Sequence, residues 1–253
     1  MLLAIDIGNS DIVLGWHDGL AWTHLFRHPV DQYVSLEASL QAYLRTEGLA
    51  WDQVSQLVLS SVVPGITPTV RTILERMSGR APFVLGPALF EQMGMGIDNT
   101  AEIGSDLVAN AVAGYTRFGA ACIVVDFGTA LTFTMVSGEG RILGVSIAPG
   151  LGTAMRALSY NTAQLPQVPL EFPPSAIGKN TPHALQAGIM LGYVGLIKEL
   201  LDRIQAEMGQ PAKVVATGGL SQKLAPLADR FDVIDPHLTL EGIRLIGQRF
   251  SAG

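Results

Sequence analysis

The order of apolar and polar residues along the chain predicts strands and helices in alternation. Short apolar runs that end at Asp, Gly or Pro indicate buried strands, and apolar positions that recur every three or four residues indicate amphipathic helices. On this basis, and apart from the hairpins described next, strands are expected at 57–63, 83–85, 142–147, 214–216 and 231–234. Helices are expected at 30–47, from 67, from 105, at 150–160, from 181 to about 208, and at 240–250. This alternation is typical of the α/β class.

Two segments of the chain resemble each other. Residues 3–19 and 123–138 each begin with an apolar strand that ends in Asp-x-Gly, turn, resume as a second β-rich run, and reach a glycine-containing turn. Asp6 aligns with Asp126, and Gly8 aligns with Gly128. We therefore predict a duplicated domain, with one half at 1–117 and the other at 118–253. Each half is expected to hold a mixed sheet that is led by an antiparallel hairpin and flanked by helices.

Several helix ends carry recognisable signals. Thr67 and Thr181 each precede a proline, which predicts that each threonine is an N-cap with proline at the first helical position. Ser105 is expected to cap the helix that begins there. The helix that begins at 181 carries three glycines close to one face, which suggests close backbone packing there rather than flexibility; these residues are Gly188, Gly192 and Gly195.

Composition narrows the class of protein. The 253 residues are 48% hydrophobic and 15% charged, which allows a substantial core and disfavours long disordered stretches. A net charge of −6 provides no general attraction to nucleic acid or to anionic membranes, and no apolar segment is expected to be long enough to span a bilayer. The single cysteine, Cys122, lies in an apolar run and is expected to be a core residue. A cytoplasmic protein is the default expectation.

The strand-to-turn aspartates are the strongest candidates for chemistry. Asp6 is followed by Gly8, Asn9 and Ser10, so this turn offers a carboxylate, backbone N–H donors and two short polar side chains. Such backbone donors bind anions, and a carboxylate beside them can hold Mg²⁺ through water. One Asp-x-Gly alone is more often a plain tight turn. Here a second copy follows, at 126–129, and a late strand ends in the glycine pair at 217–219, on which an adenosine could lie.

This set of three motifs resembles the phosphate-1, phosphate-2 and adenosine motifs of the superfamily of actin, hexokinase and heat-shock ATPases. Within that superfamily, nearly the whole chain resembles the type III pantothenate kinases, in order and with compatible spacing. The segments that carry the resemblance are 60–64, 98–106, 125–130, 147–150, 177–181 and 216–220. The resemblance implies an actin-like ATPase fold and transfer of the γ-phosphoryl group of ATP to pantothenate, the first step towards coenzyme A. It also implies a homodimer.

The resemblance further assigns roles to residues. Asp106 would be the general base, although by itself a first-turn aspartate that complements a helix dipole would be the simpler interpretation. Asp6 would hold Mg²⁺ through water, and Asp126 would hold a monovalent cation, K⁺ or NH₄⁺. The acceptor would contact Asn99, Gly104, Ser105, Asp106, Leu107 and Thr181. ATP would contact Asp6, Ile7, Gly8, Asn9, Ser10, Asp11, Ile12, Val13, Gly128, Thr129, Gly218 and Gly219.

The chain departs from the family pattern at the acceptor motif. Leu107 stands where the family usually has an arginine that binds the pantothenate carboxylate, Ile97 replaces a usual tyrosine, and Thr100 replaces a usual proline. Loss of a charge-assisted contact costs about 1.5–3 kcal/mol unless another cation replaces it. Three hypotheses follow: a pantothenate kinase with a rebuilt carboxylate contact, which we favour; a related kinase for a different small acceptor; or a non-catalytic, nucleotide-binding regulatory protein.

Overall fold

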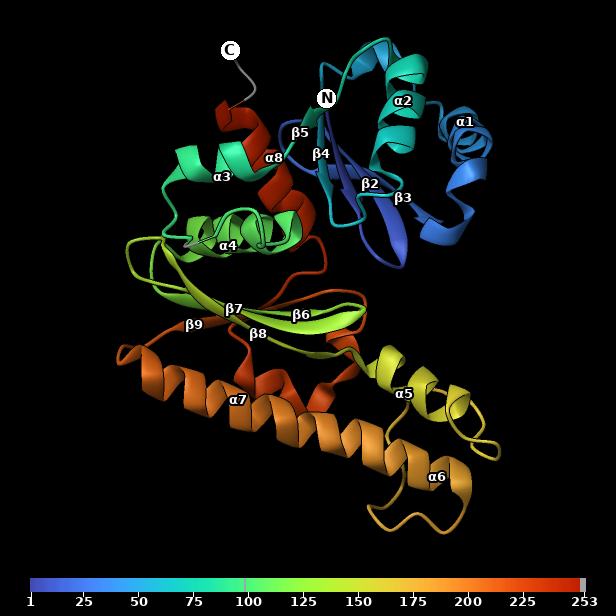
Figure 1. The fold of residues 1–253 in the computed structure, drawn as a ribbon, viewed down its shortest axis with the longest axis vertical. Coiled ribbons are helices and arrows are strands. Elements are labelled where there is room, and N and C mark those ends of the chain that lie inside the picture. Colours follow the sequence, from blue (N-terminus) through green and yellow to red (C-terminus); the bar gives the residue numbers. More distant parts are fainter. Residues whose placement is uncertain (98, 251–253) are drawn as a thin grey trace. The chain divides into compact units, whose positions relative to one another are not determined.

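The computed structural model describes residues 1–97 and 99–250, and in it the chain forms two units. The first unit contains Met1–Ala113 and the C-terminal segment that begins at Leu238. The second unit is the continuous segment Gly114–His237. Figure 1 gives the labels of the helices and strands used below.

The first unit is built on a five-stranded mixed sheet with the order β3-β2-β1-β4-β5. β1 pairs antiparallel with β2 and parallel with β4. The strands are β1 (Leu2–Ile7), β2 (Asp11–His17), β3 (Trp22–Pro29), β4 (Gln56–Ser61) and β5 (Phe83–Val84). The helices are α1 (Leu36–Glu47), α2 (Thr67–Ser78), α3 (Pro87–Met93), α4 (Ser105–Phe118), which runs on into the second unit, and α8 (Leu238–Phe250). A 3₁₀ turn (Val30–Ser35) precedes α1, and another (Trp51–Gln53) follows it.

Helices cover both faces of this sheet. On one face α1 and α2 pack their apolar stripes on the odd-numbered residues of β1, with Leu3, Ile5 and Leu40 fully buried. On the other face α8 packs on β1 and β4, so closely that a side chain at Gly247 would overlap Val58. The start of α2 differs from the prediction, because Thr67 is the first helical residue and its hydroxyl donates to the Val63 carbonyl.

The second unit repeats this architecture with the strand order β10-β9-β6-β7-β8. β6 pairs antiparallel with β7 and parallel with β9, as β1 does with β2 and β4. Its strands are β6 (Cys122–Phe127), β7 (Ala130–Val136), β8 (Ile142–Pro149), β9 (Lys213–Thr217) and β10 (Val233–Ile234). Its helices are α5 (Leu151–Tyr160), α6 (Thr181–Gln186) and α7 (Gly192–Met208). Two 3₁₀ turns, Ser221–Lys223 and Ala225–Arg230, link β9 to β10.

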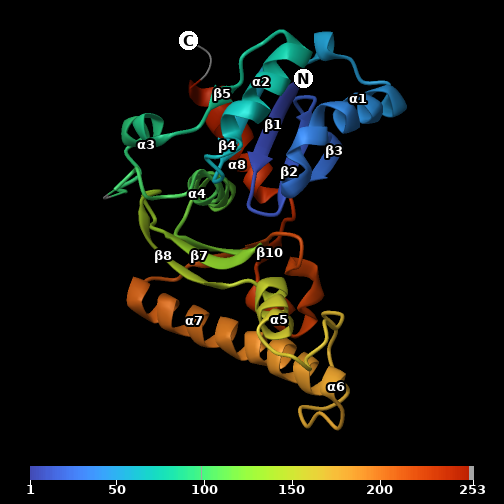
Figure 2. The ribbon, with the colours of Figure 1, turned by 45° about the vertical axis from the view of Figure 1, so that its right-hand side comes forward.

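A π-helical turn (Ala187–Leu191) joins α6 to α7 in one long helix, and α5 packs against that turn (Figure 2). The buried face of the long helix lies in the core of the second unit, with Ile197 and Leu201 almost fully buried. The prediction that no segment could span a membrane is corrected here. The helical stretch Thr181–Met208 is long and apolar enough by length and composition, and 44% of its most apolar window is buried inside the structure.

Close packing at the glycines of the long helix is not made by another described segment of the same chain, so the prediction of close backbone packing there stays a prediction. A side chain added at Gly188, Gly192 or Gly195 would meet nothing in the described part of the chain. In contrast, the core role of Cys122 is confirmed: the residue is fully buried, and burial raises the pKa of its thiol to about 12.

The two sheets confirm the duplicated α/β fold that the repeated hairpins predicted. Strand by strand, β1 to β5 correspond to β6 to β10 in order and direction. The C-terminal helix α8 packs in the first unit, whereas the division at 117/118 counts it with the second half. The boundary between the two duplicated halves of the sequence, at 117/118, stays a prediction.

Candidate active site

In the first unit, the turn between β1 and β2 carries the residues predicted to bind ATP phosphates. The Gly8 amide donates to the Asp11 carbonyl at 2.9 Å and closes the turn, which leaves the side chains of Asn9 and Ser10 exposed at its tip. Ile7 and Ile12 pair across the hairpin, and both side chains are fully buried in the core. These two residues can therefore offer only backbone groups to a ligand.

An ion pair flanks this turn. The Arg27 guanidinium, on β3, donates to the Asp11 carboxylate at 2.8 Å. In register, Arg27 lies opposite Val13, and Val13 lies opposite Asp6, so Arg27 and Asp6 lie on the same face of the sheet. The pair offsets the negative charge of Asp11 beside a loop that is expected to bind phosphate.

A cluster of serines connects Asp6 to the predicted base. β1 lies between β2 and β4, and Ser60 of β4 is the register partner of Asp6. The Ser60 hydroxyl lies 2.8 Å from the Ser105 hydroxyl. The Ser105 hydroxyl also accepts from the Ser61 amide at 3.0 Å. Ser105 therefore does not cap α4 as predicted. Instead it ties the start of that helix to the end of β4, which holds Asp106 in the same part of the unit as Asp6.

Asp106 is half-buried at the first turn of α4. Burial raises the pKa of its carboxyl, partly offset by the Leu107 amide, which donates to Oδ1 at 2.8 Å. A side chain at Gly104 would overlap this carboxylate oxygen, so the glycine lets the Asp106 carboxylate keep its position. A carboxyl group with a raised pKa is suited to take up a proton.

The rest of the predicted acceptor motif is less well placed. Leu107 is buried, with 9% of its side chain exposed, and it contributes no charge. Asn99 is exposed, and its side chain accepts from the Ala101 amide at 3.2 Å. Asp98, which belongs to the same motif, lies outside the described residues.

In the second unit, Asp126 lies in a row of polar side chains. Its register partners are Thr132 on β7 and Thr217 on β9, which place a threonine on each side of the carboxylate. Both threonine hydroxyl oxygens are buried, and within residues 1–97 and 99–250 neither has a hydrogen-bond partner. Buried hydroxyls are normally satisfied, so these two oxygens and the carboxylate form a fitting donor set for a monovalent cation.

The turn after Asp126 is supported by the start of α5. The Gly150 amide donates to the Thr129 carbonyl at 2.9 Å, and the Thr153 hydroxyl donates to the same carbonyl at 2.7 Å. A side chain at Gly150 would overlap the Gly128 carbonyl. These contacts hold the Gly128–Thr129 turn in place.

Gly218 joins the predicted adenosine motif to Asp126. It has φ +89°, and a Cβ there would lie 2.6 Å from Asp126 Oδ1 and 2.7 Å from the backbone of Phe127. We expect Gly218→Ala to raise the KM for ATP about tenfold or more, because the strained backbone and the contact displace the carboxylate. Steady-state kinetics with varied ATP measures this. Gly138→Ala, in the β7–β8 turn with an ordinary contact to Gln210, is the matched control, and an equal KM in both variants would contradict the prediction.

Thr181 does not cap α6 as predicted. Asn180 is the N-cap, and its side chain accepts from the His183 amide at 2.9 Å. Thr181 is the first helical residue and is exposed. Its hydroxyl is therefore not committed to the cap.

Sequence reasoning missed Ser60 as a partner of Ser105, and Thr132, Thr153 and Arg27 as supporting residues. Alternate residues of β7 face the same side of the sheet, and this period of two places Thr132 on the polar face. Counting outward from the turn of the β6–β7 hairpin would also have paired Thr132 with Asp126. Ser60 lies in the 60–64 segment of the resemblance, but no local signal shows that it contacts Ser105, or that Arg27 contacts Asp11, because these contacts join different secondary-structure elements.

Comparison with solved structures identifies the fold class. The chain superimposes over 98% of its length, with TM-score 0.58 and 23% identity, on a conserved putative Baf family transcriptional activator from Campylobacter jejuni, 98% of which is covered. It also matches a putative 2-dehydro-3-deoxygalactonokinase from Sinorhizobium meliloti, with TM-score 0.57, 12% identity and coverage of 100% of this chain and 98% of the other. These neighbours and the duplicated sheets define an actin-like ATPase fold.

Sequence comparison identifies the family. Residues 2–203 match the family model described as type III pantothenate kinase. The type III pantothenate kinase of Moorella thermoacetica is 42% identical over 98% of this chain and 99% of its own length. That of Geotalea daltonii is 39% identical over 98% of both chains. The chain belongs to the type III pantothenate kinase family, which confirms the resemblance drawn from its motifs.

Proposed function

We propose that Asp106 is the general base of the pantothenate kinase reaction. The protein is an ATP-dependent phosphotransferase that phosphorylates pantothenate in the synthesis of coenzyme A. The primary hydroxyl of pantothenate attacks the γ-phosphorus of ATP, its proton passes to the Asp106 carboxylate, and ADP leaves. A carboxylate of raised pKa supports this role, because it accepts the proton more readily than an ordinary aspartate does.

The observation that carries this proposal is the tie between Ser60 and Ser105. Through it the acceptor motif is fixed to the strand beside Asp6, so that the base and the metal carboxylate belong to one rigid arrangement within the first unit. Positioning and neutralisation of charge account for most of the catalysis of phosphoryl transfer.

Each of the two turns carries groups that suit ATP. Asn9, Ser10 and the backbone of the first turn suit phosphate oxygens, and Asp6 suits Mg²⁺ held through water. Mg²⁺ would supply neutralisation of phosphate charge. Gly128 and Thr129 suit the phosphates from the second unit, and Gly218 and Gly219 suit the adenosine.

Asp126 would hold a monovalent cation, K⁺ or NH₄⁺. Support comes from the buried hydroxyls of Thr132 and Thr217 on either side of the carboxylate, whose oxygens lack other partners in the part of the chain that the structure describes. Such a cation would add positive charge beside the second phosphate turn.

A cytoplasmic homodimer is the assembly that we propose. The open glycine face of the long helix, together with the exposed Leu191, offers an apolar surface without side chains in the way. Thr181, at the start of the same helix, would contact the acceptor.

The proposal is tested by incubating the purified protein with Mg²⁺, K⁺, ATP and pantothenate and following 4′-phosphopantothenate by mass spectrometry. We expect saturable formation of product that requires ATP. Measurable binding of ATP without product would contradict the proposal and favour a different, less charged acceptor, for which the buried Leu107 is the motivating observation.

A further inference from the structure

The turn between β1 and β2 is held by contacts from β3 as well as by its own backbone. The Gly8 amide closes the turn on the Asp11 carbonyl at 2.9 Å. The Val30 amide, just beyond β3, donates to the Ser10 carbonyl at 2.9 Å. From β3 itself, the Arg27 guanidinium donates to Asp11 Oδ2 at 2.8 Å. The guanidinium therefore lies at the turn, and the strand that carries it is bonded to the tip of the same turn.

The charge around this turn is mostly negative. Asp6 and Asp11 are both acidic, and residues 1–26 contain no Lys or Arg. Among the described strands of the first unit, only β3 carries a Lys or Arg, and that residue is Arg27. Both carboxylates would repel a triphosphate at the turn, and Mg²⁺ beside Asp6 would offset only part of this repulsion. Arg27 is the side chain placed to supply a further positive charge.

The ion pair with Asp11 does not use the full capacity of Arg27. The Arg27 side chain is 60% exposed and the Asp11 side chain 31%, and an ion pair this exposed contributes little to stability. A guanidinium has several N–H donors, and in the described part of the chain Arg27 makes a hydrogen bond only through Nη1. The other donors can bind a phosphate group, which accepts parallel hydrogen bonds from a guanidinium.

We propose that Arg27 donates to a β- or γ-phosphate oxygen of ATP at this turn, and that Asp11 orients the guanidinium for that contact. The inference rests on the proposed function and adds a phosphate-binding residue to it. In phosphoryl-transfer enzymes Mg²⁺ bridges β- and γ-phosphate oxygens. Arg27 and Asp6, the proposed magnesium carboxylate, share one face of the sheet, so the guanidinium is expected at that end of the nucleotide.

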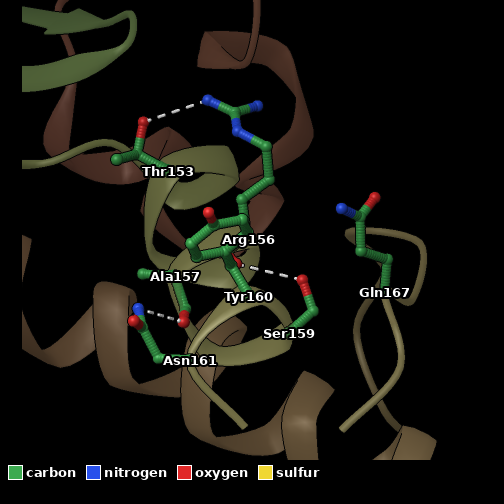
Figure 3. A pocket seen from close by; sticks show the side chains of 7 residues that line it. All are labelled: Thr153, Arg156, Ala157, Ser159, Tyr160, Asn161 and Gln167. Carbon is green, nitrogen blue, oxygen red and sulfur yellow. Dashed lines mark hydrogen bonds between the residues drawn. The ribbon is translucent and has the colours of Figure 1, made fainter. Parts of the chain in front are cut away.

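Arg156 of the second unit provides a comparison. It lines an open pocket of about 590 Å³ beside α5, where its guanidinium donates to the Thr153 hydroxyl at 3.3 Å (Figure 3). The residues that line this pocket include neither Gly128 nor Thr129. Arg156 is thus linked to the second turn only through Thr153, whereas Arg27 contacts a residue of the first turn directly. This direct contact favours Arg27 as the phosphate ligand.

Nucleotide binding tests the inference without relying on turnover. Calorimetry with Mg²⁺ gives the Kd of ATP and the Kd of AMP, which keeps the adenosine and the α-phosphate but lacks the β- and γ-phosphates. For Arg27→Ala we expect the Kd of ATP to rise about 10- to 100-fold, the effect of losing a charge-assisted hydrogen bond. The Kd of AMP should stay unchanged. Arg27→Lys should recover part of the affinity for ATP, because a lysine keeps the charge without the planar fork.

A double variant separates direct contact from neutralisation of Asp11. If Arg27 acted only by neutralising Asp11, adding Asp11→Asn to Arg27→Ala would restore the affinity for ATP. Direct contact predicts that the double variant still binds ATP about tenfold or more weakly than the unaltered protein does. Full restoration in the double variant, or an equal loss of affinity for ATP and AMP in Arg27→Ala, would overturn the inference.

Arg76→Ala is the matched control. The Arg76 side chain is 59% exposed and pairs with Glu37 of α1, on the face of the sheet opposite Asp6. This variant should leave both Kd values unchanged, and its Tm should match that of Arg27→Ala because both ion pairs are exposed. If the unaltered protein binds ATP but forms no 4′-phosphopantothenate, the proposed function fails and the binding comparison still decides the role of Arg27. If the unaltered protein does not bind ATP, both fail.

Discussion

Replacing Asp106 by asparagine is expected to lower kcat for pantothenate phosphorylation by about 10²- to 10⁴-fold, the usual contribution of a general base. The amide keeps the size of the side chain and can still accept from the Leu107 amide, but it cannot take the proton of the acceptor hydroxyl. The KM for ATP should change little, because the nucleotide contacts lie elsewhere. Rates of product formation in the two proteins, measured by mass spectrometry, test this directly.

Stability provides the control for Asp106→Asn. Burial raises the pKa of Asp106, so the folded state binds this proton more tightly than the unfolded chain does. The free energy of unfolding therefore falls as pH rises from the ordinary aspartate pKa through the raised value, and above the raised value the whole penalty is present. Asparagine carries no such penalty, so thermal unfolding of the variant should occur at an equal or higher temperature. A variant that is both inactive and less stable would point to a structural role for Asp106.

Gly242→Ala is expected to cause the largest loss of stability. Gly242, on α8, lies against the backbone of Ala109 on α4, and an added side chain would overlap the Ala109 carbonyl. The Thr239 hydroxyl of α8 also donates to Asn110 Oδ1 of α4 at 2.8 Å. If α8 moved away from α4 to make room for the added side chain, this hydrogen bond would be lost. Overpacking against backbone costs about 3 kcal/mol. In a protein of this size that corresponds to a fall in Tm of about 6–12 °C by calorimetry.

Gly65→Ala is the matched control for this loss. Gly65 lies in the turn before α2, its φ is not positive, and a side chain there would meet nothing in the described residues. The variant should gain up to about 1 kcal/mol, because the added side chain reduces the freedom of the unfolded chain. Equal Tm values for Gly242→Ala and Gly65→Ala would show that α4 and α8 do not pack as closely as described.

Much of the fold could be predicted from the sequence because its strongest signals are periodic and repeated. Apolar spacing and turn residues predict both hairpins, whose first strands end near Asp6 and Asp126. They also predict the helix at 151–160 and the C-terminal helix. Trp22–Pro29 was not identified as a strand, since this edge strand is only half-buried and contains two histidines and a proline. Pro87–Met93 is too short for a helical period to stand out.

The site was less predictable where it depends on contacts between distant segments. Ser105 and Thr181 both precede helical stripes, and local sequence cannot show that one is drawn to β4 or that the cap of α6 is the preceding Asn180. In the same way, the glycines of the long helix share a face, but only the structure shows that nothing in the described chain covers them. The motif residues themselves were found because their chemistry is local: a carboxylate, a glycine and a hydroxyl within one turn.

The return of α8 to the first unit has a consequence for synthesis on the ribosome. The sheet of this unit is fully translated early, yet the helix that covers one face of β1 and β4 is translated last. At usual translation rates, the nascent N-terminal segment waits between about 6 and 25 s for this partner. During that time the second unit, which is continuous in sequence, can fold. We expect chaperones to bind the apolar face of this sheet until α8 has been synthesised. A chain without α8 would leave that face of β1 and β4 permanently uncovered.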